Sequence, residues 1–152
     1  MTITIRPVAQ ADKAQFRALF QAYLIFYKSE LPEIALDTTW NRFFDTNEPV
    51  NAAVAIDDAQ PDKVIGFVTW VFHRSTWFVN DIIYLQDLFV DPESRNVGAG
   101  RKLIEHVYAE ADKHNVPKVY WHTDSFNHRA QLLYTKVGIK NDKVCYVRPW
   151  QK

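Results

Sequence analysis

The sequence predicts one α/β domain over residues 1–152, built on a mixed, mostly antiparallel sheet of six to seven strands flanked by about four helices. Short β-branched or apolar runs alternate with longer segments of helical spacing, in the order β-α-α-β-β-β-α-β-α-β. Residues 84–123 form a strand, turn, helix and second strand, so these two strands are expected to be parallel neighbours. The length of 152 residues suits a single hydrophobic core and is short for two.

The first half of the chain is predicted to hold four strands and two helices. TITIR alternates β-branched and polar residues, as a short strand does. Helical spacing then continues until Pro32 closes the region, and a weaker helical pattern follows. The turn-forming DDAQPD separates two apolar runs, the second of which is expected to pair with a third run as an antiparallel hairpin. The expected strands cover residues 2–6, 52–56, 64–72 and 81–90, and the expected helices cover residues 10–27 and 38–44.

The second half is predicted to hold two helices and two strands. The helices are expected at residues 103–114 and 126–136, and the strands at residues 118–123 and 143–147. Asp124 or Ser125 can cap the second of these helices, and Val137-Gly138 ends it.

The composition predicts a soluble globular protein that is expected in the cytoplasm, with the nucleus left open. Hydrophobic residues make up 47% of the chain, and no apolar run approaches the roughly 18 residues that span a bilayer, so we expect no membrane partner. The 18 basic and 18 acidic residues cancel, which removes any general attraction to nucleic acid. Cys145 is the only cysteine and the histidines lack metal-ligand spacing, so we expect no disulfide and no metal site.

Two of the chain's four glycines, Gly98 and Gly100, lie where a buried strand gives way to an amphipathic helix. Glycine lets backbone N–H groups at the start of a helix come close to a ligand. These groups have no intrahelical partner and lie at the positive end of the helix dipole, so they suit an anion such as pyrophosphate. Arg95, Arg101 and Lys102 add positive charge there. The same glycines also fit a tight strand-to-helix turn that binds nothing.

The motif does not match two other phosphate-binding loops. A Walker A loop needs Gly-Lys-Ser/Thr, and a dinucleotide fingerprint needs a third glycine where this chain has Leu103. Arg-x-x-Gly-x-Gly after a strand and before a helix instead resembles the acetyl-CoA pyrophosphate loop of the GNAT acetyltransferase superfamily. The resemblance extends from Ile5-Arg6-Pro7 to the helix near residue 134. It implies the GNAT (acyl-CoA N-acyltransferase) fold, acetyl-CoA as co-substrate, no metal, and coenzyme contacts from Arg95, Asn96, Val97, Gly98, Ala99, Gly100 and Arg101.

Asn127, Gln131 and Tyr134 form a stripe of hydrogen-bonding groups at positions i, i+4 and i+7 of the last helix. From spacing alone, Tyr134 is equally a half-buried aromatic with its hydroxyl in water. GNAT proteins carry a matching Asn-x6-Tyr pair that contacts the coenzyme and supplies an acid. The resemblance implies that Asn127 binds the pantetheine arm, that Tyr134 protonates the departing thiolate, and that Lys136 is a further coenzyme-binding residue. A phenol has a reference pKa near 10, not far from that of an alkyl thiol, so this proton transfer is close to thermoneutral.

The strand YLQDLFV, residues 84–90, looks like the Tyr-Leu-Glu-Asp strand of the diamine (spermidine/spermine-type) acetyltransferase branch. The glutamate of that branch faces the amine, but this chain has Gln86 in its place. Asp87 is a candidate base, although it points to the opposite face of an ideal strand unless a bulge re-aims it. His122 is the second candidate. The family also implies that backbone N–H groups where this strand splays from its neighbour, at Leu88, Phe89 and Val90, bind the pantetheine and the thioester oxygen.

The acceptor is only broadly indicated. HRSTW, YWHTD and NHRAQLLY resemble the fungal histone/D-amino-acid acetyltransferase subgroup, which acts on basic proteins, small polyamines or free amino acids. We therefore expect direct attack on acetyl-CoA, in a ternary complex, by a primary amine of a small molecule or basic peptide. Relatives pair or exchange C-terminal strands, so we expect a homodimer. The family places Tyr23, Phe26, Tyr27, Glu30 and Gln86 around the acceptor, although the aromatic ones fit a plain core equally well.

Two other functions fit parts of the pattern. A non-catalytic acyl-CoA-binding or regulatory module would keep the glycine loop and lose the chemistry, and Gln86 in the usual acid's place favours it. The Asn127 and Tyr134 pair favours the enzyme. A nucleotide-phosphate binder would use the loop alone and bind ATP or NAD.

Overall fold

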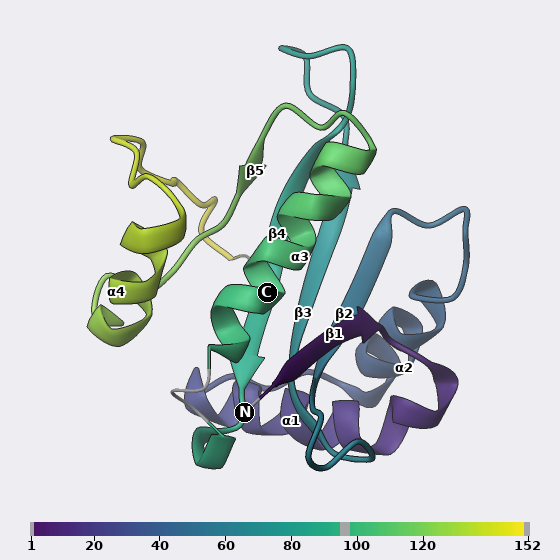
Figure 1. Ribbon diagram of the computed structural model, residues 1–152. Helices are drawn as coiled ribbons and strands as arrows, with labels where there is room; N and C mark the ends of the chain where they lie inside the picture. The colour runs from purple at the N-terminus through teal and green to yellow at the C-terminus, as the bar shows by residue number, and fades with distance from the viewer. Residues whose placement is uncertain (1, 95–97, 151–152) are drawn as a thin grey trace. The chain divides into compact units, whose positions relative to one another are not determined.

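Five strands form one sheet in the order β1-β2-β3-β4-β5 (Figure 1). The computed structural model describes residues 2–94 and 98–150, and the chain divides into two compact units, Met1–His122 and Thr123–Lys152, each described by itself. The whole sheet belongs to the first unit. Its strands are β1 (Ile3–Pro7), β2 (Val50–Asp57), β3 (Val64–His73), β4 (Ile82–Val90) and β5 (Val119–Tyr120).

The sheet is mixed, as predicted, but it has fewer strands than expected. Strands β1 to β4 are antiparallel neighbours, and β5 joins β4 in parallel. The prediction of six to seven strands is wrong, because residues 143–147 form no strand in the described part of the chain and β5 has only two residues. Alternating side chains show that a segment can be extended, but a strand also needs a neighbouring backbone to complete its hydrogen bonds.

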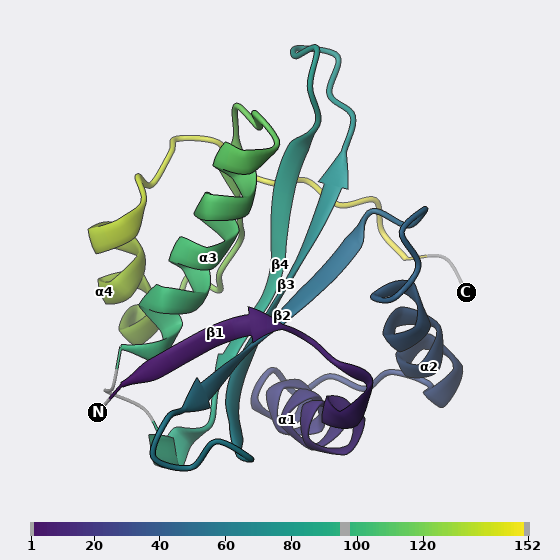
Figure 2. The ribbon, with the colours of Figure 1, turned by 45° about the vertical axis from the view of Figure 1, so that its right-hand side comes forward.

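Helices cover both faces of the sheet (Figure 2). On one face lie α1 (Lys13–Phe26) and α2 (Glu33–Arg42), and on the other lies α3 (Ala99–Lys113), the crossover between β4 and β5. Short 3₁₀ turns at Gln10–Asp12 and Pro92–Ser94 precede α1 and follow β4. The helix predicted at residues 38–44 starts earlier, directly after Pro32, because proline fits the residue before the first turn of a helix and Glu33 favours that turn's positive end.

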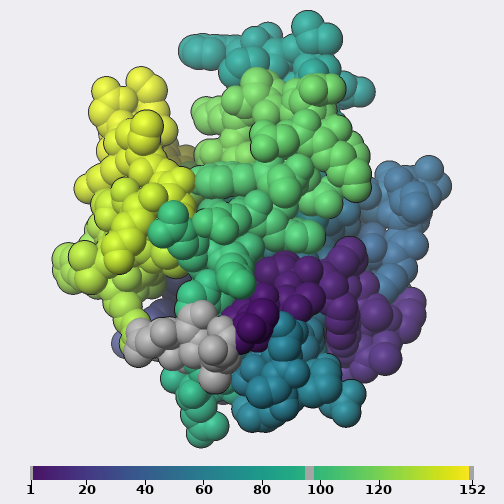
Figure 3. Space-filling view, in the orientation of Figure 1, coloured from purple at the N-terminus to yellow at the C-terminus, as the bar shows by residue number. Residues whose placement is uncertain are grey.

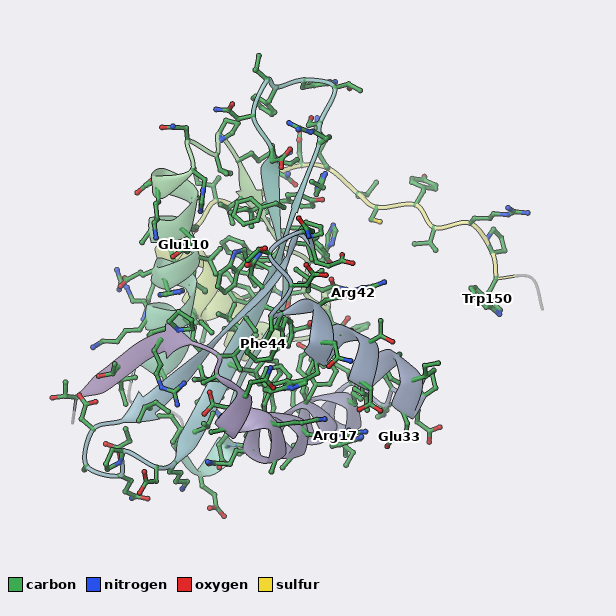
Figure 4. The ribbon with its side chains drawn as sticks, turned by 90° about the vertical axis from the view of Figure 1, so that its right-hand side faces the viewer. Arg17, Glu33, Arg42, Phe44, Glu110 and Trp150 are labelled. Atoms are coloured by element: carbon green, nitrogen blue, oxygen red, sulfur yellow. The ribbon has the colours of Figure 1, made fainter. Side chains whose placement is uncertain are left out.

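The two faces of the sheet bury different side chains. Against α1 and α2 lies an aromatic cluster that includes Phe16, Trp40, Phe67 and Phe89, with Phe16 and Phe67 rings 4.9 Å apart. Arg17 ties α1 to α2 through ion pairs with Glu33 and with Asp37 at 2.9 Å (Figure 4). The buried side chains of α3 itself are aliphatic: Leu103, Ile104, Val107 and Ala111 recur at helical spacing.

Arg6 and Asp12 hold β1 to the turn before α1. Arg6 donates Nη1 to Asp12 Oδ2 at 2.7 Å and Nη2 to Oδ1 at 2.8 Å, and the Ala9 amide donates to Oδ2 at 2.8 Å. The hydrogen bonds from Arg6 keep the pKa of Asp12 below its ordinary value. The arginine of the Ile-Arg-Pro opening therefore has a structural role.

The second unit contains α4 (His128–Val137) and an extended segment. Its cap differs from the prediction: Asn127, rather than Asp124 or Ser125, accepts the helical N–H of Ala130 through its side chain, at 3.2 Å. The carbonyls of Asp124 and Ser125 instead accept from Gln131 Nε2 at 3.1 and 3.2 Å. None of the helices in the described ranges is long and apolar enough to cross a membrane.

Candidate active site

A β-bulge in β4 decides where Asp87 points. Thr69 of β3 pairs with Asp87 and the next residue, Trp70, pairs with Leu85, so Gln86 is one extra residue in β4. Leu85 is buried opposite Trp70, whose ring meets His106 of α3 at 5.7 Å. The bulge that could re-aim Asp87 is therefore present, and Leu85 and Asp87 face opposite sides of the sheet although they are only two residues apart.

Asp87 lies on the α1 face in a half-buried, hydrogen-bonded position. Thr69 Oγ1 donates to Asp87 Oδ2 at 2.6 Å, and the Tyr23 side chain of α1 is a second hydrogen-bond partner. Burial raises the pKa of Asp87 above its ordinary value, and the bonds from Thr69 and Tyr23 oppose the rise without cancelling it. A carboxylate with a raised pKa is a stronger base than an exposed one, which suits proton abstraction near neutral pH.

Pairing between β4 and β5 stops well before β4 ends. In the described part of the first unit the parallel register joins only Ile83 with Val119 and Tyr84 with Tyr120, whereas β4 continues to Val90. Leu88, Phe89 and Val90 pair on their other side with β3. This short register is the geometry expected of a strand that splays from its parallel neighbour.

Four ring-bearing side chains gather where the β4–β5 pairing ends. His73 Nε2 lies 2.7 Å from the Tyr120 hydroxyl, and Tyr84 OH lies 3.2 Å from His122 Nδ1. The Tyr84 and Tyr120 rings are 5.0 Å apart, which joins the two pairs. We call His73, Tyr84, Tyr120 and His122 the Tyr–His cluster. Of its members only His122 was proposed from the sequence, because the others come from three separate strands. Counting along β3 in steps of two from buried Phe67 could have identified His73 as lying on the same face.

The aromatic residues at the end of α1 lie beside Asp87. The Tyr23 ring packs against Phe89 at 5.9 Å and against Tyr27 at 5.0 Å, and the Tyr27 ring contacts Phe26 at 5.1 Å. Tyr23 thus serves the core and reaches the candidate site, and Tyr27 extends the same wall. Phe26 is 53% exposed and Glu30 is exposed after the helix, so these two are surface residues of the wall.

The glycine turn before α3 shows why Gly98 is a glycine. Gly98 is the N-cap of α3 with φ 80° and ψ 10°, a left-handed conformation that strains any other residue. An added Cβ would find no described atom within 4 Å, so the requirement comes from the backbone and not from crowding. Ala99 is buried, and only its backbone can reach a ligand. The sequence also assigned the loop residues Arg95, Asn96 and Val97, which lie outside the described residues.

Two cations of this turn have protein partners. Arg101 Nε donates to Glu105 Oε1 at 2.9 Å, one helical turn along α3. Lys102 Nζ donates to the Ile3 carbonyl of β1 at 3.2 Å, so Lys102 links the helix to the sheet. The sequence had instead led us to expect that Lys102 adds positive charge to the loop.

In the second unit, Asn127 lies at the N-terminal end of α4 and Tyr134 lies within the helix. Asn127 is the cap, with non-helical φ and ψ of −83° and 69°, and Tyr134 lies within α4, where its carbonyl accepts the Gly138 amide at 2.8 Å. Both side chains are half-buried, and Lys136 is exposed. The described residues include no group of three or more His, Cys, Asp or Glu side chains that could hold a metal ion.

Residues 15–139 match the Acetyltransferase (GNAT) family. The chain belongs to the GNAT acetyltransferase family. It is 42% identical over 146 residues to D-amino-acid N-acetyltransferase HPA3 of Saccharomyces cerevisiae, an alignment that covers 96% of this chain and 90% of the yeast protein. It is 33% identical over 84 residues to thialysine N-epsilon-acetyltransferase of Bos taurus, covering 55% of this chain and 49% of that one. The prediction of an acetyltransferase enzyme is thereby confirmed.

Solved structures confirm the GNAT fold. A probable acetyltransferase superimposes with a TM-score of 0.83 at 19% identity, covering 100% of this chain and 99% of the other. A ribosomal-protein-alanine N-acetyltransferase from Brucella melitensis biovar Abortus 2308 gives a TM-score of 0.80 at 17% identity, covering 99% and 100%. At such low identity the likeness concerns the fold and says nothing of the acceptor.

Proposed function

We propose that the protein transfers the acetyl group of acetyl-CoA to a primary amine by direct attack in a ternary complex, with both units forming one catalytic domain. The observation that carries this proposal is the bulged β4: it turns Asp87 toward α1, loses its β5 partner after Tyr84, and leads into the left-handed Gly98 turn at the start of α3. This arrangement would connect an amine site and an anion site through one strand and one turn.

The donor would be held by the turn and by β4. Backbone N–H groups of the loop formed by Arg95, Asn96, Val97, Gly98, Ala99, Gly100 and Arg101 would bind the pyrophosphate, because the start of α3 carries the positive end of its dipole. Backbone groups of Leu88, Phe89 and Val90 would bind the pantetheine amides and the thioester oxygen. Asn127 and Lys136 would add contacts from the second unit.

In the proposed reaction the amine lone pair attacks the thioester carbonyl carbon, so a C–N bond forms and the C–S bond breaks. The leaving thiolate takes a proton from the Tyr134 hydroxyl, and the amine nitrogen loses one proton. An alkylammonium has a reference pKa of about 10.4, so a base must act first near neutral pH. Asp87, with its raised pKa, and His122, beside Tyr84, are the proposed candidates.

We propose an amino acid as the acceptor, in preference to a polyamine. Two relatives are named for D-amino acids and for thialysine, both of which carry an amine and a carboxylate. Gln86 is neutral where the diamine branch has a carboxylate, and Lys118 Nζ lies 5.4 Å from the Tyr120 ring. The ammonium of Lys118 suits an acceptor that bears an anionic group. Tyr23, Phe26, Tyr27 and Glu30 would wall the slot.

We also propose a homodimer. The final segment of the second unit exposes apolar side chains, with Val144 80%, Val147 82% and Trp150 89% exposed. A second copy of the chain would cover them, because exposed apolar side chains at this density are typical of interaction surfaces.

The test is an assay of coenzyme A release over a panel of amino acids, polyamines and lysine peptides, with Tyr134→Phe as the variant and Tyr108→Phe, another half-buried tyrosine, as the matched control. We expect amine-dependent release, and a kcat about 10²-fold lower in Tyr134→Phe because the general acid is lost. Calorimetry should show unchanged acetyl-CoA affinity in both variants. Binding of acetyl-CoA without turnover on any amine would instead identify a non-catalytic module, and comparable affinity for ATP or NAD would identify a nucleotide binder.

A further inference from the structure

The orientation of the His73 imidazole is fixed by its two partners. Nδ1 lies 2.8 Å from the Arg74 carbonyl oxygen, and Nε2 lies 2.7 Å from the Tyr120 hydroxyl. A carbonyl oxygen can only accept, so Nδ1 carries the hydrogen of the neutral ring. Nε2 therefore holds a lone pair and accepts the Tyr120 proton, which leaves the oxygen lone pairs of Tyr120 directed elsewhere.

Tyr120 lies at the place where the sheet opens. It is the last residue of β5, it pairs with Tyr84, and the bulge at Gln86 follows Tyr84 along β4. His73 and Thr69 are both an even number of residues from Phe67 on β3, so His73 faces the same side of the sheet as the Thr69–Asp87 pair. The pair thus lies on the sheet face that carries the proposed amine site.

We propose that Tyr120 and His73 form a proton relay that deprotonates the acceptor ammonium, a role that rests on the N-acetyltransferase function proposed above. The ammonium N–H bond breaks as the Tyr120 oxygen takes its proton, and the Tyr120 O–H bond breaks as its own proton passes to His73 Nε2. The products are a neutral amine and an imidazolium whose Nδ1–H donates to the Arg74 carbonyl. His73 then releases the proton to water. In this arrangement Tyr120 touches the substrate, and His73 acts through it.

The burial of Tyr120 favours a relay over a tyrosinate base. Burial raises the pKa of Tyr120, so its hydroxyl stays protonated until the proton passes to His73. Lys118, the residue before β5, approaches the ring, and Tyr84 and His122 face it from β4 and from the segment after β5. In the hairpin, the Arg74 guanidinium pairs with Asp81 at 3.3 Å, so its charge is partly compensated while its carbonyl serves His73.

A simpler role for the same bonds is a clamp that holds the β3–β4 hairpin to β5, and one substitution separates the two roles. In His73→Asn the amide N–H can still donate to the Arg74 carbonyl, but the shorter side chain ends before the Tyr120 hydroxyl and cannot take a proton. Loss of a clamp would lower activity equally at every pH, whereas loss of a relay would lower it most at acid pH. Tyr120→Phe removes the hydroxyl that would take the ammonium proton. His114→Asn is the control, because it makes the same substitution as His73→Asn at the end of α3, on the other face of the sheet.

The readout is kcat/KM for the amine from about pH 6 to about pH 10, measured with the best amine of the panel and saturating acetyl-CoA. We expect His73→Asn and Tyr120→Phe to lose about 10²-fold at the acid end. The loss should shrink as the pH approaches the ammonium's own pKa, because a neutral amine needs no base. Acetyl-CoA affinity, melting temperature and the His114→Asn profile should match the wild type.

Three results would overturn the relay. A wild-type profile in His73→Asn, or a loss that is equal at every pH, would leave only the clamp. A loss concentrated at the acid end in His122→Asn, with the wild-type profile kept in the other two variants, would assign the proton to His122. In each case the wild-type protein still turns over. A wild-type protein that acetylates no amine would overturn the proposed function, and the relay with it.

Discussion

The two faces of the central strands are built for different purposes. On one face, α3 packs its own aliphatic side chains against the sheet, with Leu103, Ile104 and Val107 fully buried. On the α1 face an aromatic core gives way along β3 and β4 to hydrogen-bonded polar groups, first Thr69 with Asp87 and then the Tyr–His cluster. Figure 3 shows α3 covering its face, with the β3–β4 hairpin tip projecting past the end of the helix.

The extra residue Gln86 makes the difference between the two faces possible. Because Gln86 is extra, Leu85 stays in the α3 core while Asp87 turns to the other face. A regular strand would place both on one side, and a half-buried carboxylate would then lie among aliphatic side chains at a cost of several kcal/mol. A bulge thus lets a single strand serve a core on one face and a candidate reaction site on the other.

The largest effect, on the free energy of unfolding, is expected on the face of the sheet that α3 covers. Leu103→Ala should lower the free energy of unfolding by about 3 kcal/mol, because it removes a fully buried side chain and leaves a cavity. Denaturant unfolding followed by circular dichroism measures it. Leu31→Ala is the control: Leu31 is 44% exposed, and a loss below about 1 kcal/mol is expected there. Equal losses at both positions would show that the α3 face is not the tighter core.

The bulge itself is expected to matter more for catalysis than for folding. Deleting Gln86 restores a regular register in which Leu85 and Asp87 keep their faces, so the fold should survive. The local bend of β4 is lost, and displacement of reacting groups by about 1 Å can cost about 10²-fold in kcat/KM. Coenzyme A release measures the change, and Gln86→Ala is the control that keeps the bulge and removes the side chain. Equal activity in the deletion and the wild type would make the bulge irrelevant to the reaction.

The smallest effect is expected at Asp87. Because its pKa is raised in the folded protein, the wild type loses stability as the pH rises from the unfolded value of about 3.9 through the folded one. Asp87→Asn cannot ionise, so its stability relative to the wild type should increase over that window and then level off. Thermal unfolding against pH measures this difference.

The matched control for Asp87 is the exposed pair in which Thr4 Oγ1 donates to Asp58 Oδ1 at 2.6 Å, the same kind of bond without the burial. A pH-dependent gain of equal size in Asp58→Asn would contradict burial as the cause. A kcat that is unchanged in Asp87→Asn would remove Asp87 from the candidate bases.

Elements with a strong local pattern were predictable. The helix expected at residues 103–114 is α3, and the hairpin of β3 and β4 lies where apolar runs and a turn placed it. The strand predicted at residues 118–123 is shorter in the structure and covers only Val119–Tyr120. Residues 143–147 form no strand in the described ranges. In both cases the segment's own residues permit a strand, but the extent of pairing depends on a neighbour that the local pattern does not specify.

The sequence by itself determined the family, because the glycine motif between a strand and a helix is carried by local residues. The left-handed backbone that requires glycine at position 98 was seen only in the structure. Only the tertiary structure decided which way Asp87 faces and which side chains meet Tyr120. The direction of a side chain on a strand depends on its register with the neighbouring strand, and His73, Tyr84 and Tyr120 are brought together by that register. The candidate amine site is therefore a property of the sheet and of no single segment.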